Sequence, residues 1–440
     1  MEADEGRADL YERAVELLLA RWENRLVRKE SGQCTVDPGL IQRLGLRMDV
    51  VRGALGRVAF AAHERQGSDR GSSDRAADIP REDLREELGR ELGSVDRADQ
   101  VIAYIRDRAG LLHQLDNRTY AFAHRTFQEY LAARHLLSAA EPAAELGKRV
   151  RKDLTWWREV FLLAAGSAKR TTPSVITNLV NDLLPGPPPG NAVSSKKAEE
   201  AGLAGQALVE TDFIDHVRRE AEDRMPEDGP GSYASCLDKV QQWLLASLCA
   251  DPTVAARERA RAGATLAPLG DPRREVLDPD EMQFSLVHEV EVWLGSGDDD
   301  EMAFDDEKTK RKPRRYALGY GYWMARFPVT NAQFEHFVKD KGYGEARARY
   351  WIEAQAAGVW SGGEVEGRFD DLPRTAPSDY RSSFTLQNHP VVGITWYEAL
   401  AIRAGSPSAG GRRGSSVRTR RSRCPPSPSG RRRRGGARDH

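Results

Sequence analysis

Cysteine is scarce in this 440-residue chain, and its arrangement excludes two kinds of structure. None of the cysteines belongs to a C-x-x-C pair or has histidines at ligand spacing. They are Cys34, Cys236, Cys249 and Cys424. The sequence therefore predicts neither a disulfide framework nor a zinc site. We expect reduced cysteines, most of them buried.

Long apolar runs and targeting signals are lacking too. The longest apolar candidate, residues 243–250, is far shorter than the ~18 residues that a membrane-spanning helix needs. The N-terminus is acidic and does not show the basic-then-apolar order of a signal peptide. We therefore expect a cytoplasmic protein without membrane contact.

A phosphate-binding loop is also missing. The motif G-x-x-x-x-G-K-[ST] does not occur, and the nearest Gly-Lys pair, Gly147-Lys148, has no upstream glycine at the needed spacing and is followed by arginine. Without backbone amides arranged to cradle phosphates, no ATPase site is expected in this chain. We accordingly expect no bound cofactor.

Charge is distributed unevenly. Residues 403–440 hold 12 arginines and one acid, a net charge of +11, so residues 1–402 carry −12 of the total of −1. An acidic body repels nucleic acid, which leaves only non-specific binding through the basic end of the chain.

Residues 120–137 (YAFAHRTFQEYLAARHLL) predict a strand followed by a helix. Tyr120, Phe122 and His124 alternate with alanines, which is the period of a half-buried strand. Thr126 is placed to cap the helix, and Glu129, three residues later, completes a capping box. Upstream, residues 111–115 predict a partner strand, and Asp116-Asn117 a two-residue turn with left-handed backbone.

This hairpin and helix resemble the winged-helix end of NACHT-type (STAND) signalling ATPases, which carry a phrase like F-x-H-R/K-[ST]-F-Q-E-[YF]-x-A. The resemblance implies that His124 contacts the nucleotide diphosphate and senses the nucleotide, and that ATP or ADP binds in a full-length relative. Imidazole can donate a hydrogen bond to phosphate. The alternative is that His124 donates to a backbone carbonyl.

Further helices are predicted on both sides of the hairpin. Apolar periodicity indicates helices at residues 10–26, with Leu10, Ala14, Leu17, Leu18 and Trp22 on the buried face, and at 39–64, 95–108, 153–166, 233–250 and 254–269. Pro80 suits the first position of another helix. Residues 66–79 and the Pro- and Gly-rich residues 184–197 predict an exposed loop and a linker.

A second module begins near residue 280. Residues 314–328 predict one strand with close backbone approach at its glycines. Thr330 with Gln333, and Thr395 with Glu398, predict two capping boxes, the second after a short buried strand at residues 391–394. The acidic residues 295–307 could suit calcium, but the order of ligands in an EF-hand is not met, and a solvated loop is expected.

The phrases at residues 325–338 and 388–399, with Trp351 and Trp360 between them, resemble the formylglycine-generating enzyme, or sulfatase-modifying factor, superfamily. The resemblance covers residues 280–402 and implies an α+β fold related to C-type lectins. It implies either a ligand-binding module or an oxidase. The cysteine pair of the oxidases is absent, and His288, His336 and His389 do not form the H-x-x-x-H-x-E motif of iron-dependent members.

Residues 403–440 have one large aliphatic residue, Val417, so they cannot offset their ordering entropy and are expected to be disordered. We interpret them as out-of-frame translation of a GC-rich gene that interrupts the second domain. A basic arm for nucleic acid or an anionic membrane is the alternative.

Together these patterns predict a multidomain chain, mainly α over its first two-thirds, followed by an incomplete α+β domain. We expect a winged-helix part at 1–140, a helical connector at 141–275, the second domain at 280–402 and the tail at 403–440. The predicted function is a non-catalytic part of a bacterial signal-transduction protein, with an unknown protein or small ligand bound by the second domain and possible self-association. The alternative is a formylglycine-generating or related non-haem metal oxidase acting on protein cysteines or small thiols.

Overall fold

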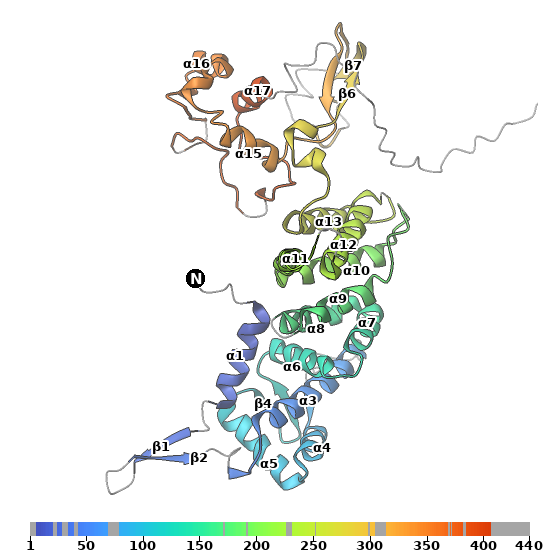
Figure 1. Cartoon of the computed structure of the whole chain (residues 1–440), viewed down its shortest axis with the longest axis vertical. Coiled ribbons are helices and arrows are strands. Elements are labelled where there is room, and N and C mark those ends of the chain that lie inside the picture. The colour runs from blue at the N-terminus through green and yellow to red at the C-terminus, as the bar shows by residue number, and fades with distance from the viewer. Residues whose placement is uncertain are drawn as a thin grey trace, which may run out of the picture. The chain divides into compact units, whose positions relative to one another are not determined.

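The structure is a computed structural model of the chain. It describes residues 6–20, 24–28, 34–38, 43–68, 79–169, 172–190, 192–225, 231–250, 252–297, 300–303, 314–367, 370, 372–381 and 384–405. The chain forms two compact units, shown in Figure 1. The first unit contains Met1–Leu277 together with Arg381–Pro390, and the second contains Asp278–Tyr380 and Val391–His440.

The first unit begins with a helix, a hairpin and a second helix. Helix α1 (Arg7–Ala20) is shorter than predicted, since residues 24–28 form strand β1 (Asn24–Arg28), which pairs antiparallel with β2 (Cys34–Pro38). Helix α3 (Met48–Ser68) starts well after residue 39. Strand β1 therefore overlaps the end of the first predicted helix, while β2 lies between the two predicted helices.

The predicted buried face of α1 is wrong. Val15 and Leu19 are fully buried, whereas Leu10 and Leu17 are more than half exposed. Leucine lies all around this helix, so periodicity alone did not identify the side that packs on α8 (Leu154–Ala168). Trp22 lies outside the described residues.

The winged-helix region contains a small antiparallel sheet. Its strands, in the order β3-β5-β4, are β3 (Ile79–Pro80), β5 (Thr119–Phe122) and β4 (Leu112–Gln114). Helices α4 (Arg81–Leu92), α5 (Val95–Tyr104) and the π-helix η1 (Ile105–Ala109) precede the hairpin, and α6 (Arg125–Leu137) follows it. Ile79, predicted to lie in an exposed loop, is buried because it pairs with Tyr120. Pro80 is the N-cap of α4 rather than its first residue.

The predicted hairpin forms with a different turn. The backbone N–H groups of Leu115 and Asp116 both donate to the carbonyl of Thr119, and the Asp116 carboxylate accepts from the N–H of Arg118 at 2.7 Å. Neither Asp116 nor Asn117 has a positive φ. A side-chain turn thus replaces the left-handed backbone that was expected.

Helices α7 (Pro142–Lys152), α8 and α9 (Pro173–Leu183) continue the first unit. Asp153 caps α8 by accepting from the N–H of Trp156. Trp157, Val160 and Phe161 are buried in the core. The helix predicted at residues 153–166 is confirmed.

In the Pro- and Gly-rich segment after α9, residues 185–190 are mostly exposed, and buried apolar residues stand on either side of them. Leu184 and Val193 are fully buried, and Trp243 donates its indole N–H to the carbonyl of Gly186 at 2.7 Å. The last residues of the predicted linker already belong to α10 (Ser195–Glu210). Proline prevents helix formation here, and the buried residues Leu184 and Val193 anchor the segment.

The rest of the first unit is helical, as expected. It contains α11 (Phe213–Glu222), α12 (Ser232–Cys249) and α13 (Ala256–Leu269), of which α10, α12 and α13 pack on one another (Figure 1). Gly270, with φ of 81°, ends α13 as the sequence predicted. The short 3₁₀ helix η3 (Arg274–Val276) follows.

The second unit has short strands and helices. After η4 (Pro279–Glu281), β6 (Phe284–Val287) pairs with β9 (Tyr322–Ala325), and β7 (Val290–Leu294) pairs with β8 (Arg314–Leu318). The single strand predicted at 314–328 is therefore two strands. A Cβ at Gly321 would lie 3.2 Å from the carbonyl oxygen of Val287, so the predicted close backbone approach is confirmed there, but a Cβ at Gly319 would have no neighbour within 4 Å, so it is wrong at that glycine.

Both predicted capping boxes of the second unit form. The remaining elements are α15 (Asn331–Lys339), η5 (Glu345–Tyr350), α16 (Ile352–Ala356), β10 (Trp360–Ser361), β11 (Glu364–Val365) and α17 (Trp396–Gly405). Thr330 and Gln333 cap α15 reciprocally, and Thr395 and Glu398 do the same at α17. Residues 391–394 are not a strand, which corrects that prediction.

Several predictions fall wholly or partly on undescribed residues. The start of the tail, residues 403–405, completes α17, while 406–440 lie outside the described residues. Of the acidic segment, the structure describes 295–297 and 300–303, where Met302 is 90% exposed. Across the described helices, no stretch combines the length and apolarity that crossing a bilayer requires.

Candidate functional site

Helix α6 begins at the predicted sensor residue, but without the predicted capping box. His124, in an extended conformation with φ of −137° and ψ of 138°, is the N-cap residue, and its side chain makes no capping hydrogen bond. The helix cap therefore lies two residues earlier than the sequence indicated. Thr126 lies inside its first turn and does not cap it.

Glu129 does not reach back to the start of the helix because another residue binds it. Its carboxylate accepts a hydrogen bond from Nε of Arg125 at 2.8 Å, and its side chain is only 6% exposed. The same guanidinium lies over the ring of Trp156 in α8, with 4.2 Å between Cζ and the ring centroid. The buried acid thus holds Arg125 along the helix.

Burial raises the pKa of Glu129, against the opposing effect of Arg125. Glu159 raises this pKa further and Arg7 lowers it. A carboxylate in this position keeps its charge chiefly because a cation is paired with it.

The electrostatics at the start of α6 favour an anion. No acid lies in the first turn, and within the described residues the backbone N–H groups of Arg125 and Thr126 donate to no partner. Helix N-termini carry partial positive charge, which an acid or a bound anion normally offsets. Here the side chains at the terminus are a histidine and an arginine instead.

The imidazole of His124 is exposed and near one aromatic ring. Its centroid lies 5.9 Å from that of Phe127. Within the part of the chain that the structure describes, it donates to no backbone carbonyl, so the alternative interpretation of this histidine is wrong. The geometry leaves the ring nitrogens available to a ligand.

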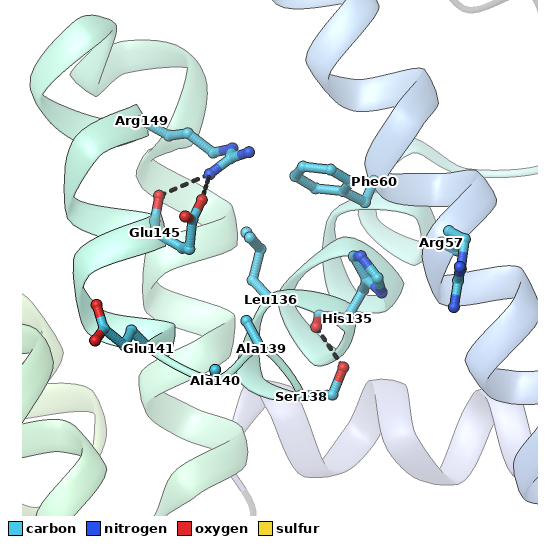
Figure 2. Close-up of a pocket in the computed structure, with 10 residues that line it drawn as sticks. All are labelled: Arg57, Phe60, His135, Leu136, Ser138, Ala139, Ala140, Glu141, Glu145 and Arg149. Carbon is cyan, nitrogen blue, oxygen red and sulfur yellow. Dashed lines mark hydrogen bonds and ion pairs between the residues drawn. The ribbon is translucent and has the colours of Figure 1, made fainter.

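A separate cavity of about 570 Å³ lies near the other end of α6 (Figure 2). Arg57 and Phe60 come from α3, His135 and Leu136 from the end of α6, and Arg149 from α7. No sequence pattern indicated this cavity, since its walls join residues 57–60 to the distant residues 135–149.

Two of the charged groups around the cavity pair with each other. Arg149 donates to the carbonyl and carboxylate of Glu145, as Figure 2 shows, and its guanidinium lies 4.8 Å from the ring of Phe60. Burial lowers the pKa of His135, and the positive charges of Arg57 and Arg149 lower it further. The neutral imidazole is therefore favoured here.

A buried polar cluster in the second unit joins distant parts of its sequence. Arg374 donates to both carboxylate oxygens of Glu398 and to Asp370, and the hydroxyl of Tyr343 donates to Glu398 as well. Burial raises the pKa of Tyr343, and the nearby Glu398 charge adds to the shift. Sequence reasoning found the capping role of Glu398 but missed its partners, which lie 24 and 55 residues away.

The histidines of the second module do not meet in a common site. His288 and His336 are exposed, and His389 lies in a turn where its backbone N–H donates to Leu386, as predicted. Among the described residues, no group of three or more His, Cys, Asp or Glu side chains is placed to hold a metal ion. Cys236 is buried and Cys249 exposed, both as free thiols.

Comparison with known proteins identifies both modules. Residues 7–136 match the model of the winged helix-turn-helix domain C-terminal to NACHT, and residues 276–404 match that of the sulfatase-modifying factor enzyme 1-like domain. Neither a curated protein nor a solved structure matches the chain. The chain therefore joins a NACHT-associated winged helix to a sulfatase-modifying-factor-like domain, which confirms the fusion that the sequence predicted.

Proposed function

We propose that this chain belongs to a bacterial, cytoplasmic signal-transduction protein of the NACHT (STAND) type. Its winged helix would sense a nucleotide phosphate through His124. ATP or ADP would be the nucleotide, held mainly by the NACHT module of such a protein. The chain's own contribution is a contact that reports which nucleotide is bound.

The observation that carries this proposal is the position of His124 at the start of α6. An exposed imidazole stands at a helix N-terminus that lacks a side-chain cap and has no acid in its first turn. Free amides, the helix dipole and a histidine together suit a phosphate. A local rule of helix capping is broken here, as is common at functional sites.

The second domain would recognise a ligand or a protein and act as the input of the switch. Its match to the sulfatase-modifying factor enzyme 1-like family supports a binding or catalytic module. We favour the binding role, because the iron-binding histidine motif does not occur in the matched residues 276–404.

Titration of the full chain with pyrophosphate, followed through the backbone amide signals of Arg125 to Phe127, tests the winged-helix proposal. We expect weak binding that shifts these signals, with affinity reduced about tenfold in His124→Ala, the effect of losing one charge-assisted hydrogen bond. His113→Ala, at an exposed histidine of β4, is the matched control. Unchanged signals, or equal affinity of His124→Ala and wild type, would contradict the proposal.

A further inference from the structure

We infer that Arg125 is a second phosphate-contacting residue at the His124 site, and that its ion pair with Glu129 keeps it away from that site until the phosphate binds. The inference rests on the proposed function, since it concerns the same ligand. Binding would require Arg125 to leave Glu129 and turn toward the phosphate beside His124.

The first argument is the position of Arg125. It is the first residue of α6 and follows the N-cap His124 directly. A cation at this end of a helix opposes the helix dipole, so the dipole does not stabilise arginine at this position. A bound phosphate would remove the conflict, because it would place negative charge between the helix terminus and the guanidinium.

The second argument is the ion pair that Arg125 forms with Glu129 when no phosphate is bound. Glu129 lies one turn further along α6, so the ion pair draws the guanidinium along the helix and away from the free amides of the first turn. The ring of Trp156 lies beneath the same guanidinium and fixes its plane. Trp156 is itself anchored, since its indole N–H donates to the carbonyl of His63 at 3.0 Å.

The third argument is the asymmetry of the pair. The Arg125 side chain is 55% exposed, whereas that of Glu129 is 6% exposed. The arginine can therefore move into solvent or toward a ligand while the acid stays in place. Pairs with one exposed partner are weak enough for a phosphate to compete with them.

Release of Arg125 has a consequence for Glu129. The groups that face its carboxylate are Arg125 on α6, Glu159 on α8 and Arg7 on α1. Without Arg125 the buried acid would lose its nearest cation and would favour the protonated form. Phosphate binding at this site is thus expected to be accompanied by proton uptake at Glu129.

The test compares pyrophosphate affinity among variants of the full chain, with the same amide signals as the probe. Glu129→Gln frees Arg125 and should tighten binding about two- to fivefold, the range expected for loss of one competing ion pair. Arg125→Gln should weaken binding by a similar factor, and Arg125→Lys should retain part of it. Glu145→Gln, which breaks the Arg149 pair on α7, is the matched control and should change nothing.

A pH series provides a readout that a purely structural role would not move. The affinity ratio of Glu129→Gln to wild type should approach one as the pH falls through the raised pKa of Glu129, because the protonated acid no longer competes for Arg125. Titration of pyrophosphate itself affects both proteins equally and cancels in the ratio.

The outcomes separate this inference from the proposed function. If His124→Ala loses binding while the Arg125 and Glu129 variants match wild type, the sensor proposal stands and the role of Arg125 is refuted. If pyrophosphate shifts no signal in wild type or in Glu129→Gln, both are refuted. Thermal unfolding of each variant shows that the affinities compare folded proteins.

Discussion

Among the described helices, three starts carry the same capping-box pattern in sequence. The box forms at the two starts in the second unit and does not form at the one in the first unit. In the second unit, Thr330 caps α15 with Gln333 and Thr395 caps α17 with Glu398. In the first unit, Thr126 and Glu129 form no such pair. The difference shows that a short-range pattern predicts a cap only when no stronger partner competes for its acid.

The competing partner explains each case. At α6, Arg125 takes Glu129, and the acid faces the core. At α17, Glu398 satisfies Arg374, Tyr343 and the cap together, because it is fully buried and accepts through both oxygens. The first arrangement leaves the N-terminus of α6 without a side-chain cap, while the second caps the N-terminus of α17.

The largest expected effect comes from breaking the arrangement at α17. Arg374→Ala would leave Glu398 buried without its cation, so we expect the second unit to lose about 3–5 kcal/mol of unfolding free energy. Hydrogen exchange of residues 330–365 would report the loss. The double variant with Glu398→Gln should be less damaging than the sum of the two single changes, and strict additivity would show that the two groups do not act together.

A matched pair of threonine substitutions sharpens the comparison directly. Thr330→Ala removes a capping box and should cost about 1 kcal/mol. Thr126→Ala removes no capping bond and should change the unfolding free energy by less than about 0.5 kcal/mol. Denaturant unfolding of both variants measures the contrast, and equal losses would mean that Thr126 caps α6 in solution.

The smallest expected effect is a pH dependence at the far end of α6. The pKa of His135 is lower in the folded state than its ordinary value of 6.5, so the unfolded chain binds a proton first on acidification. The stabilisation is full above the unfolded pKa and is lost as the pH falls through the folded pKa. Between about pH 7 and about pH 5, wild type should lose more thermal stability than His135→Gln, and parallel curves would contradict this.

Local patterns predicted the elements whose contacts are local. The strand and helix at 119–137, the Gly270 helix end and the caps of Thr330 and Thr395 depend on neighbours within a few residues. Burial depends on distant partners, and here the predictions failed. Gly186, after α9, accepts a hydrogen bond from Trp243, and the buried face of α1 is the one that packs on α8.

In the candidate site, too, local sequence patterns predicted some features, while others depend on distant contacts. The motif pointed to His124. The ion pair between Arg125 and Glu129 was not predicted, because the sequence pattern had assigned Glu129 to a capping box. Glu129 is buried once α6 packs in the fold, and this burial favours the ion pair over the cap. Trp156 lies 31 positions from Arg125, beyond the reach of any helical periodicity.

The segment Arg381–Pro390 belongs to the first unit, although the family match places it inside the second module. Asn388 donates to the carboxylate of Asp271 at 2.8 Å and to the carbonyl of Gly263 at 2.9 Å. Anyone who trims the protein for expression at residue 276 would separate these partners. Neither half cut there would be whole, so the full chain is the form in which both units should be prepared.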